Sequence, residues 1–494
     1  MNKKNGDSKP LHGAYKPQLI AQVDQKSGGV NTQVVMTNYK SNKHEVPAQS
    51  ANGSTVPLVL GNPNIDPEAG DYDPFQHRNV SHPTSDLDTL IHLLKGSLGS
   101  GILSMPLAFA NSGLYFGLAS TFVVGFICTY CVHMLVRSAH SLCRRMRVPM
   151  LGFADVAETA FLAGPKPFHQ WAKFAKACIN LFLVIDLLGC CCIYVVFVAR
   201  NVKQVVDYYA PEHELDTRYY MALCLPLLLL FNTIKKLKYL APFSMIANIL
   251  MAVGMGITFY YIFNEIPNHP IDSREVMVEP IHWPMFFGTV IFALEGIGVV
   301  MPLENNMKNP THFIGCPSVL NIGMFCVICL YSSVGFFGYW VYGPETEGSI
   351  TLNLPKDEIL AQSVKIMIAI AVFLTYALQF YVPMEIIWKA MKNSYQNPKM
   401  AERVIRYSLI VLTVVIAICV PNLGGFISLV GAVCLSMLGM IFPAIIDTVT
   451  NYEDPGLGVF KWRLVKNILL IAFGLIGFVF GTYVSIKEII QDFK

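Results

Sequence analysis

The sequence predicts an all-α polytopic membrane protein, and two observations carry that prediction. Of the 494 residues, 53% are hydrophobic and 14% are charged, and the mean hydropathy is +0.47. Soluble domains carry about 25% charged residues, so this chain lacks the polar surface of a water-soluble fold. A membrane-spanning helix needs about 20 apolar residues in succession, and many such runs follow residue 84.

The composition excludes several classes of protein. It does not fit a soluble enzyme, a secreted disulfide scaffold or a nucleic-acid binder, and it predicts the lipid bilayer as a partner. The formal net charge of +3 is too small to indicate an anionic partner. Two Cys-x-x-Cys pairs, Cys128/Cys131 and Cys326/Cys329, lie in apolar segments with no histidine nearby. They therefore predict packing residues, and no metal site is expected.

Residues 1–84 predict a disordered cytosolic tail, followed by a transmembrane domain at 85–490. The tail is rich in Pro, Gly, Asn, Gln and Ser and has no apolar run long enough to bury. It lacks the apolar core of a signal peptide, so the first span is expected to act as the insertion signal. The glycosylation sequons at Asn52 and Asn79 occur by chance if the tail is cytosolic.

Eleven apolar segments predict eleven transmembrane helices. They lie near residues 88–110, 114–136, 174–199, 219–234, 240–263, 284–303, 319–341, 361–388, 404–420, 425–447 and 464–486. Basic residues gather in the loops after the second, fourth and eighth segments, whereas alternate loops carry single basic residues such as Arg274 and Lys356. This asymmetry predicts a cytosolic amino terminus, and the odd number of spans then places the carboxyl terminus outside.

The first and sixth segments are poor candidates for continuous helices. Gly96, Gly99, Gly101 and two serines crowd the first segment ahead of Pro106. The sixth segment has a second glycine-rich interruption around Glu295, also followed by a proline. Irregular backbone survives at membrane depth where it lines a protein cavity, and two broken helices offer free N–H groups to an anion and free carbonyls to a cation.

Such a pair of breaks is able to hold a zwitterion. The alternative is that the small residues only allow close packing of helices. Breaks in the first and sixth spans match a fold of two inverted repeats of five helices, which favours the binding site.

Four ionisable residues fall inside predicted spans, where charge is expensive and usually functional: His92, Lys95, Asp186 and Glu295. His92 is the candidate for proton handling, because the unperturbed pKa of histidine lies closest to neutral pH. Asp88 precedes His92 by one helical turn and is expected to be solvated. The alternative for His92 and Lys95 is that both are idle interfacial residues.

Several motifs together resemble the proton-coupled amino acid transporters of the amino acid/auxin permease group. The resemblance covers about residues 85–490 and rests on Ile91–Gly96 with Gly99, Gly101 and Pro106, on Phe286–Gly298, on Pro302–Asn305, on Gly348–Pro355, on Phe373–Glu385 and on Ile427–Gly431. It implies a leucine-transporter-type fold. It also implies a secondary active transporter that moves small neutral amino acids of the alanine, glycine and proline type by proton symport. The proton would be the coupling ion, and no cofactor is expected.

The resemblance also implies site residues. The carboxylate of the substrate would bind the backbone of Gly96, Ser97, Gly99, Ser100 and Gly101, and its amino group would bind near Phe292, Glu295 and Gly296. His92 would carry the proton coupling, and Glu295 is a second candidate if the two spans meet.

The chain departs from the family pattern at three places. Lys356 and Asp357 follow Pro355 where some family members have a cysteine, and the outer loop near 200–218 also lacks cysteine, so no outer disulfide is expected. That outer loop has no sequon either. Asp186 stands where an uncharged residue is expected, so it either alters proton affinity or bonds a neighbouring helix.

Other functions remain open from the sequence. A sodium-coupled neutral amino acid transporter of the same permease group is the closest alternative, and an amino acid sensor that signals through its tail is another. An intramembrane enzyme is least favoured, because no Asp/His/Ser constellation stands outside the family pattern, so the chain is predicted not to be an enzyme. Both the plasma membrane and a lysosomal or endosomal membrane are compatible with the sequence, and the oligomeric state is left open.

Overall fold

A computed structural model describes residues 20–21, 34–35 and 72–491, except 81, 98, 235–236, 295 and 316. The chain divides into two compact units, Met1–Asn64 and Ile65–Lys494. In the first unit, β1 (Ile20–Ala21) pairs antiparallel with β2 (Val34–Val35). Most of the predicted disordered tail lies outside the described residues.

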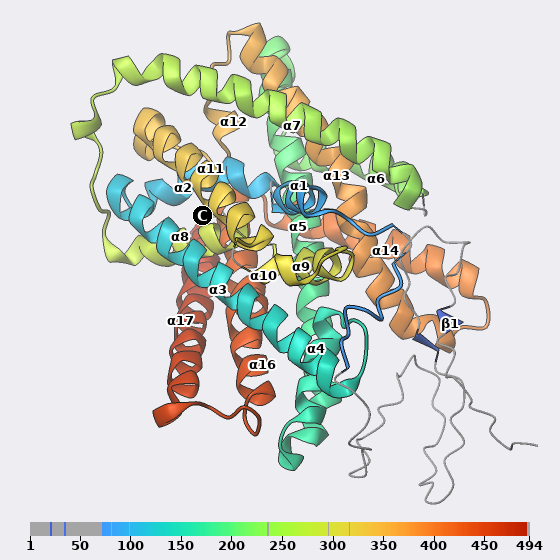
Figure 1. Cartoon of the computed structure of the whole chain (residues 1–494). Coiled ribbons are helices and arrows are strands. Elements are labelled where there is room, and N and C mark those ends of the chain that lie inside the picture. Colours follow the sequence, from blue (N-terminus) through green and yellow to red (C-terminus); the bar gives the residue numbers. More distant parts are fainter. Residues whose placement is uncertain are drawn as a thin grey trace, which may run out of the picture. The chain divides into compact units, whose positions relative to one another are not determined.

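The second unit is built from helices, and Figure 1 colours them by their order in the sequence, from blue to red. The α-helices are α1 (Asp86–Ser97), α2 (Met105–Ala110), α3 (Leu114–Met146), α4 (Phe153–Ala163), α5 (Ala172–Tyr209), α6 (Thr217–Phe231), α7 (Leu237–Glu265), α8 (Trp283–Ala293), α9 (Ile297–Asn305), α10 (Thr311–Ile314), α11 (Val319–Tyr342), α12 (Ile350–Asn353), α13 (Ile359–Met391), α14 (Pro398–Cys419), α15 (Leu423–Val430), α16 (Phe442–Thr450) and α17 (Trp462–Gln491). Short 3-10 helices are η1 (Ser100–Ser104), η2 (Lys166–Trp171), η3 (Pro211–His213), η4 (Ile266–Asn268), η5 (Ile271–Ser273), η6 (Pro280–His282), η7 (Gly343–Glu345), η8 (Lys392–Ser394) and η11 (Val459–Lys461). Two π-helical segments, η9 (Gly431–Leu435) and η10 (Met437–Ile441), join α15 to α16.

All eleven predicted apolar segments fall on helices. Among the described residues, eight helices are long and apolar enough to cross a membrane, and the bent pair formed by α1 with η1–α2 makes a possible ninth. Helix α6 has 15 residues, and α14 carries four charged side chains in its first nine residues, so neither meets the same criterion. The apolar segments are therefore helical, whereas the number of eleven membrane-spanning helices stays a prediction.

Both predicted helix breaks are present. Helix α1 ends at Ser97, and the chain resumes as a helix at Ser100 with a bend of 48°. Helix α8 ends at Ala293, and α9 begins at Ile297. The glycines predicted these interruptions because they favour non-helical backbone. The π-helical stretch between α15 and α16 was not predicted, although π-helical turns often occur at functional sites.

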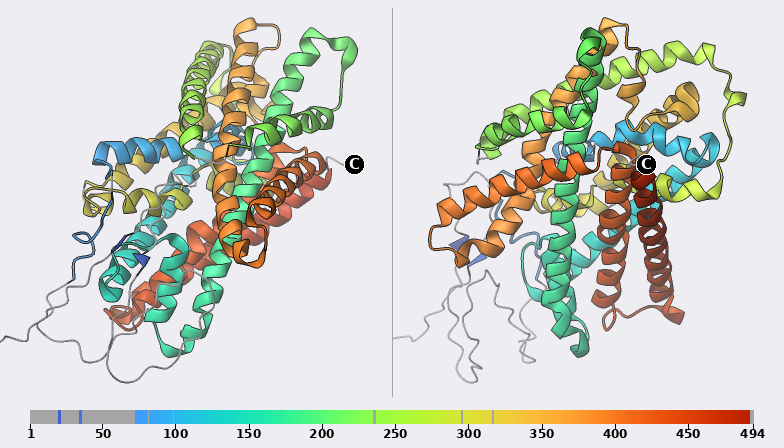
Figure 2. Two further views of the ribbon diagram at one scale, coloured as in Figure 1. Left: turned by 90° about the vertical axis from the view of Figure 1, so that its right-hand side faces the viewer. Right: turned by 180° about the vertical axis from the view of Figure 1, so that it is seen from behind.

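Small residues let the helices around these breaks approach closely. A Cβ atom at Gly288 of α8 would lie 2.6 Å from the carbonyl oxygen of Ser428, and one at Gly431 would lie 2.0 Å from the carbonyl oxygen of Gly288. The sixth span therefore packs backbone to backbone against the tenth, and no larger residue fits at either glycine. Helix α17 contacts α8 and α15 of this region, and it lies side by side with α16 (Figures 1 and 2).

The segment 72–84 belongs to the helical unit, although the sequence places it in the tail. It ends in a parallel β-bridge between Thr84 and Met307, in which the Thr84 N–H donates to Asn306 at 2.9 Å and the Lys308 N–H donates to Thr84 at 2.9 Å. These bonds tie the chain before α1 to the end of α9. Burial is the main cause that raises the pKa of the Tyr72 phenol at the start of this segment.

A buried ion cluster fixes the middle of this segment. The Arg78 guanidinium lies 3.0 Å from a carboxylate oxygen of Glu304, and the His140 Nε2 atom lies 2.7 Å from the same oxygen. Arg78 also donates to the Pro149 carbonyl at 2.9 Å. The Glu304 side chain is completely buried, so Arg78 supplies the opposite charge that this carboxylate needs.

Replacing Arg78 by alanine is expected to destabilise the helical unit, because Glu304 would remain buried without its guanidinium. Loss of one partner of a buried ion pair costs about 3–5 kcal/mol. A fall of more than about 5 °C in the unfolding temperature of the detergent-solubilised protein is expected, by fluorescence-monitored thermal unfolding. The control is Lys308→Ala, which removes an exposed positive charge near the same helix end. Equal unfolding temperatures for the two variants would contradict the assignment.

Candidate functional site

The two helix breaks lie against each other. A Cβ atom at Gly101 would lie 2.7 Å from the Cα atom of Ala293, and one at Gly296 would lie 3.1 Å from the Ser97 hydroxyl oxygen. A Cβ atom at Gly96 would lie 3.2 Å from the Val299 side chain. Three separate contacts therefore join residues 96–101 to residues 293–299, as the site inferred from the sequence requires.

The predicted residues differ in their exposure at this junction. Ser97, Ser100, Gly101 and Phe292 are buried, and Gly99 and Gly296 are partly exposed. Gly96 is exposed, and Glu295 lies outside the described residues, so the structure does not place its carboxylate. The junction therefore has both buried and accessible residues. At Gly99, no neighbouring atom lies within 4 Å of the position that a Cβ atom would take.

Ser97 has a feature typical of a binding site. Its side chain is 3% exposed, yet its hydroxyl oxygen has no hydrogen-bond partner among the residues that the structure describes. This hydroxyl lies at the second break, because Gly296 is its near neighbour. A buried polar group without a partner costs free energy, so a hydroxyl in this position is available to a polar ligand.

Two tyrosines at the junction were missed in the sequence. The Tyr331 hydroxyl of α11 donates to the Ser97 carbonyl at 2.5 Å and also interacts with the backbone of Gly99. The Tyr194 hydroxyl of α5 interacts with the Ser100 side chain. Each tyrosine places a polar hydroxyl in an apolar helix, and this pattern in the sequence could have indicated a functional residue. Only the folded chain shows that the two hydroxyls reach Ser97 and Ser100.

The predicted proton residue, His92, lies one turn before this junction on α1. The side chains of His92 and Lys95 are both exposed. The Asp88 carboxylate is close enough to His92 to interact with it electrostatically. Asp88 itself accepts a hydrogen bond from the Ser85 hydroxyl at 2.7 Å at the start of the helix, in accordance with its predicted solvated role. Asp186 is 2% exposed within α5, so it is buried in the bundle.

The Gly348–Pro355 motif lies next to the first break. Its short helix, α12, contacts η1, α2, α5 and α13. Thr351 is fully buried and donates to the side chain of Asn201 at 2.7 Å, and the Ser349 and Thr351 hydroxyls lie 2.9 Å apart. This network anchors α12 to α5 beside the first break.

A cavity touches the second break. It is lined by apolar or small residues from α1, α3, α8, α9, α11 and the π-helical segments: Leu93, Cys128, Val132, Ile291, Leu294, Gly296, Ile297, Val300, Met324, Leu435 and Gly439. Its volume is about 20 Å³, which is enough for one water molecule or a methyl group. No group of three His, Cys, Asp or Glu side chains with the arrangement of metal ligands occurs in the described part of the chain.

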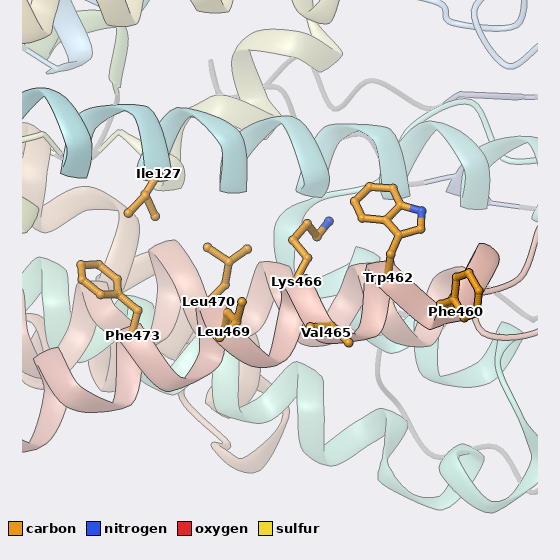
Figure 3. A pocket seen from close by; sticks show the side chains of 8 residues that line it. All are labelled: Ile127, Phe460, Trp462, Val465, Lys466, Leu469, Leu470 and Phe473. Carbon is orange, nitrogen blue, oxygen red and sulfur yellow. The ribbon is translucent and has the colours of Figure 1, made fainter.

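A larger hollow lies elsewhere, between α3 and α17 (Figure 3). It is lined by Ile127, Phe460, Trp462, Val465, Lys466, Leu469, Leu470 and Phe473. The Lys466 ammonium is 3.0 Å from the Tyr130 hydroxyl and 3.4 Å from the Asp447 carboxylate, so its charge is compensated inside the bundle. None of the predicted site residues lines this hollow, and most of α17 is accessible, as expected for a helix that faces lipid.

Comparisons with known proteins define the class. The family described as "Transmembrane amino acid transporter protein" matches residues 82–487, and the chain belongs to this family. It is a multi-pass membrane protein and an amino acid transporter.

Among particular proteins, the chain is 44% identical to "Proton-coupled amino acid transporter-like protein pathetic" of Drosophila melanogaster, over 86% of this chain and 89% of that protein. It is 27% identical to "Vacuolar amino acid transporter 4" of Saccharomyces cerevisiae, over 82% of this chain and 58% of that longer relative.

Two solved structures are also similar at 12% sequence identity. One is MHP1, a nucleobase-cation-symport-1 family transporter in a closed conformation with bromovinylhydantoin bound, with a TM-score of 0.47 over 87% of this chain and 96% of that chain. The other is a Na⁺-coupled sialic acid symporter in a substrate-bound outward-open state, with a TM-score of 0.42 over 84% of this chain and 91% of that chain.

The two glycines of the first break are expected to respond differently to substitution. Gly101→Ala places a methyl group 2.7 Å from the Ala293 backbone, and overpacking of this kind costs about 1–3 kcal/mol. Gly99→Ala adds the same methyl group where no atom lies within 4 Å. A lower unfolding temperature is expected for Gly101→Ala alone, whereas Gly99→Ala is expected to change ligand affinity without unfolding. A Gly101→Ala protein as stable as the wild type would show that the two breaks do not meet as described.

Proposed function

We propose that this protein is a secondary active transporter that moves small neutral amino acids of the alanine, glycine and proline type by proton symport. The observation that carries the proposal is the junction of the two breaks around the buried, unpaired Ser97 hydroxyl. Family membership supports amino acids as the cargo, and the name of the Drosophila relative supports coupling to protons.

The chemistry of the junction suits a zwitterion. The substrate carboxylate binds the backbone of residues 96–101, where the second half of the first span begins at Ser100 and directs its free N–H groups toward the break. The amino group binds near Phe292, Glu295 and Gly296, where α8 ends and its last carbonyl groups lack helical partners. The apolar cavity beside Gly296 suits a small uncharged side chain.

The proton is the coupling ion in this proposal, and His92 carries it. His92 lies on α1 five residues before its end at Ser97, and its accessible side chain is able to exchange protons with water or with a cavity. No cofactor takes part. The breaks in the first and sixth spans belong, in this proposal, to two inverted repeats of five helices, with an eleventh helix at the carboxyl terminus.

The amino terminus is assigned to the cytosol because the basic loops after α3, α6 and α13 lie on the same side of the membrane. The carboxyl terminus then lies on the opposite side. The membrane is assigned to the plasma membrane or to lysosomes and endosomes, and the name of the yeast relative, a vacuolar transporter, supports the internal location.

The direct test is electrical. Alanine, glycine and proline are applied to cells that express the protein at the surface, at pH 5.5 and pH 7.5, with and without sodium. Inward currents that grow in acid and persist without sodium support proton symport. Currents that require sodium would instead establish the sodium-coupled alternative, and the absence of current and uptake for every neutral amino acid would contradict transport.

His92→Ala is expected to abolish the amino-acid-evoked proton current while the protein still reaches the membrane, because alanine has no titratable group. The matched control is His312→Ala, since the exposed His312 Nδ1 atom lies 2.7 Å from the Asp86 carboxylate, away from the junction. Currents and surface-biotinylated protein are measured for both. Acid-stimulated current of wild-type size in His92→Ala would remove His92 from the mechanism.

Glu295→Gln separates proton transfer from backbone capping at the second break. Glutamine retains the shape and the hydrogen-bonding capacity of glutamate but cannot ionise. A proton-transfer role predicts that the acid stimulation of uptake flattens while surface expression is maintained. Uptake with an unchanged pH profile would assign Glu295 to capping its own broken helix.

A further inference from the structure

Helix α11 supports both halves of the broken first span. A Cβ atom at Gly323 would lie 2.6 Å from the Leu93 side chain of α1, and one at Gly335 would lie 2.5 Å from the Phe109 ring of α2. Gly338 is equally close to Pro106. The small residues of α11 therefore bring its axis close to the span on either side of the break.

Tyr331 lies between Gly323 and Gly335 on α11, at the level of the break. Its side chain is 0% exposed, and its hydroxyl donates to the Ser97 carbonyl at 2.5 Å. The same carbonyl accepts the Gly99 N–H at 3.0 Å, and the Gly99 backbone also interacts with the tyrosine hydroxyl. One phenol thus contacts the backbone on both sides of residue 98.

The bond satisfies a carbonyl that the helix itself leaves free. Ser97 is the last residue of α1, so its carbonyl has no N–H donor four residues further on. Its other donor among the described residues is the Gly99 N–H of a tight turn, so without the phenol this buried oxygen would be held by that bond alone. The Ser97 carbonyl is thus hydrogen-bonded, whereas the Ser97 hydroxyl is buried at the same place and has no partner among the described residues.

We propose that Tyr331 is a positioning residue for substrate. Its hydroxyl holds the Ser97 carbonyl away from the substrate carboxylate and fixes the backbone at Ser97 and Gly99, so that the Ser97 hydroxyl and the first N–H groups of η1 face the ligand. A carbonyl that turned toward the site would repel the carboxylate. This inference rests on the proposed transport of amino acids.

The test is Tyr331→Phe, which removes one oxygen atom and keeps the buried aromatic ring. The control is Tyr339→Phe on the same helix, because Tyr339 is also buried and its hydroxyl interacts with the backbone of Glu275, away from the break. The apparent KM for alanine, the maximal rate per surface molecule and the pH of half-maximal stimulation are measured for the wild type and both variants.

A positioning role predicts that the KM of Tyr331→Phe for alanine rises at least fivefold, while the pH of half-maximal stimulation stays that of the wild type and Tyr339→Phe keeps the wild-type KM. A KM for Tyr331→Phe within twofold of the wild type, or an equal increase in both variants, would overturn the inference.

If Tyr331→Phe shows no uptake, alanine binding to the detergent-solubilised protein decides. A weakened dissociation constant then supports positioning, and a wild-type constant overturns it. A wild-type protein that neither transports nor binds alanine would refute the proposed function itself.

Discussion

The structure depends on one constraint, which is that polar backbone groups inside a membrane must find partners within the protein. Most of the chain meets it with continuous helices. At residues 97–100 and 293–297 the helices stop, and other parts of the molecule must satisfy the free groups. Tyr331 does so at the first break through the Ser97 carbonyl, whereas the Ser97 hydroxyl beside it remains unpaired among the described residues. The junction therefore combines a fixed backbone with an available polar group.

Close approach of backbones makes this junction possible, and glycine provides it. Gly101 meets Ala293 of the sixth span, Gly288 and Gly431 join the sixth span to the tenth, and the glycines of α11 flank Tyr331. In membranes such contacts supply packing energy that apolar side chains cannot, because lipid is as apolar as leucine. The alternative explanation of the glycines as packing residues thus holds for Gly101, while Gly99 borders open space. One motif therefore holds a glycine that packs and a glycine that borders open space.

Charge is placed mainly at the ends and edges of the helical unit. The Arg78–Glu304–His140 cluster ties the chain before α1 to the end of α9, so the segment that leads into the first span is held by the second half of the sixth. Any movement of α9 relative to α1 must strain these bonds or carry segment 72–84 along. The proposed transport site contains two ionisable residues, His92 and Glu295, and its other residues are uncharged, which suits a zwitterion.

The sequence by itself determined the all-helical class of the membrane domain, the two breaks and the glycine motif at the first break, because hydrophobic run length and glycine content are local properties. The tertiary structure decided which glycine packs and which borders open space, that segment 72–84 belongs to the helical unit, and that Tyr331 and Tyr194 reach the first break. Those facts depend on contacts between residues more than 90 positions apart in the chain, such as Ser97 with Tyr331. A linear pattern carries no information on which distant backbone group a buried hydroxyl will reach.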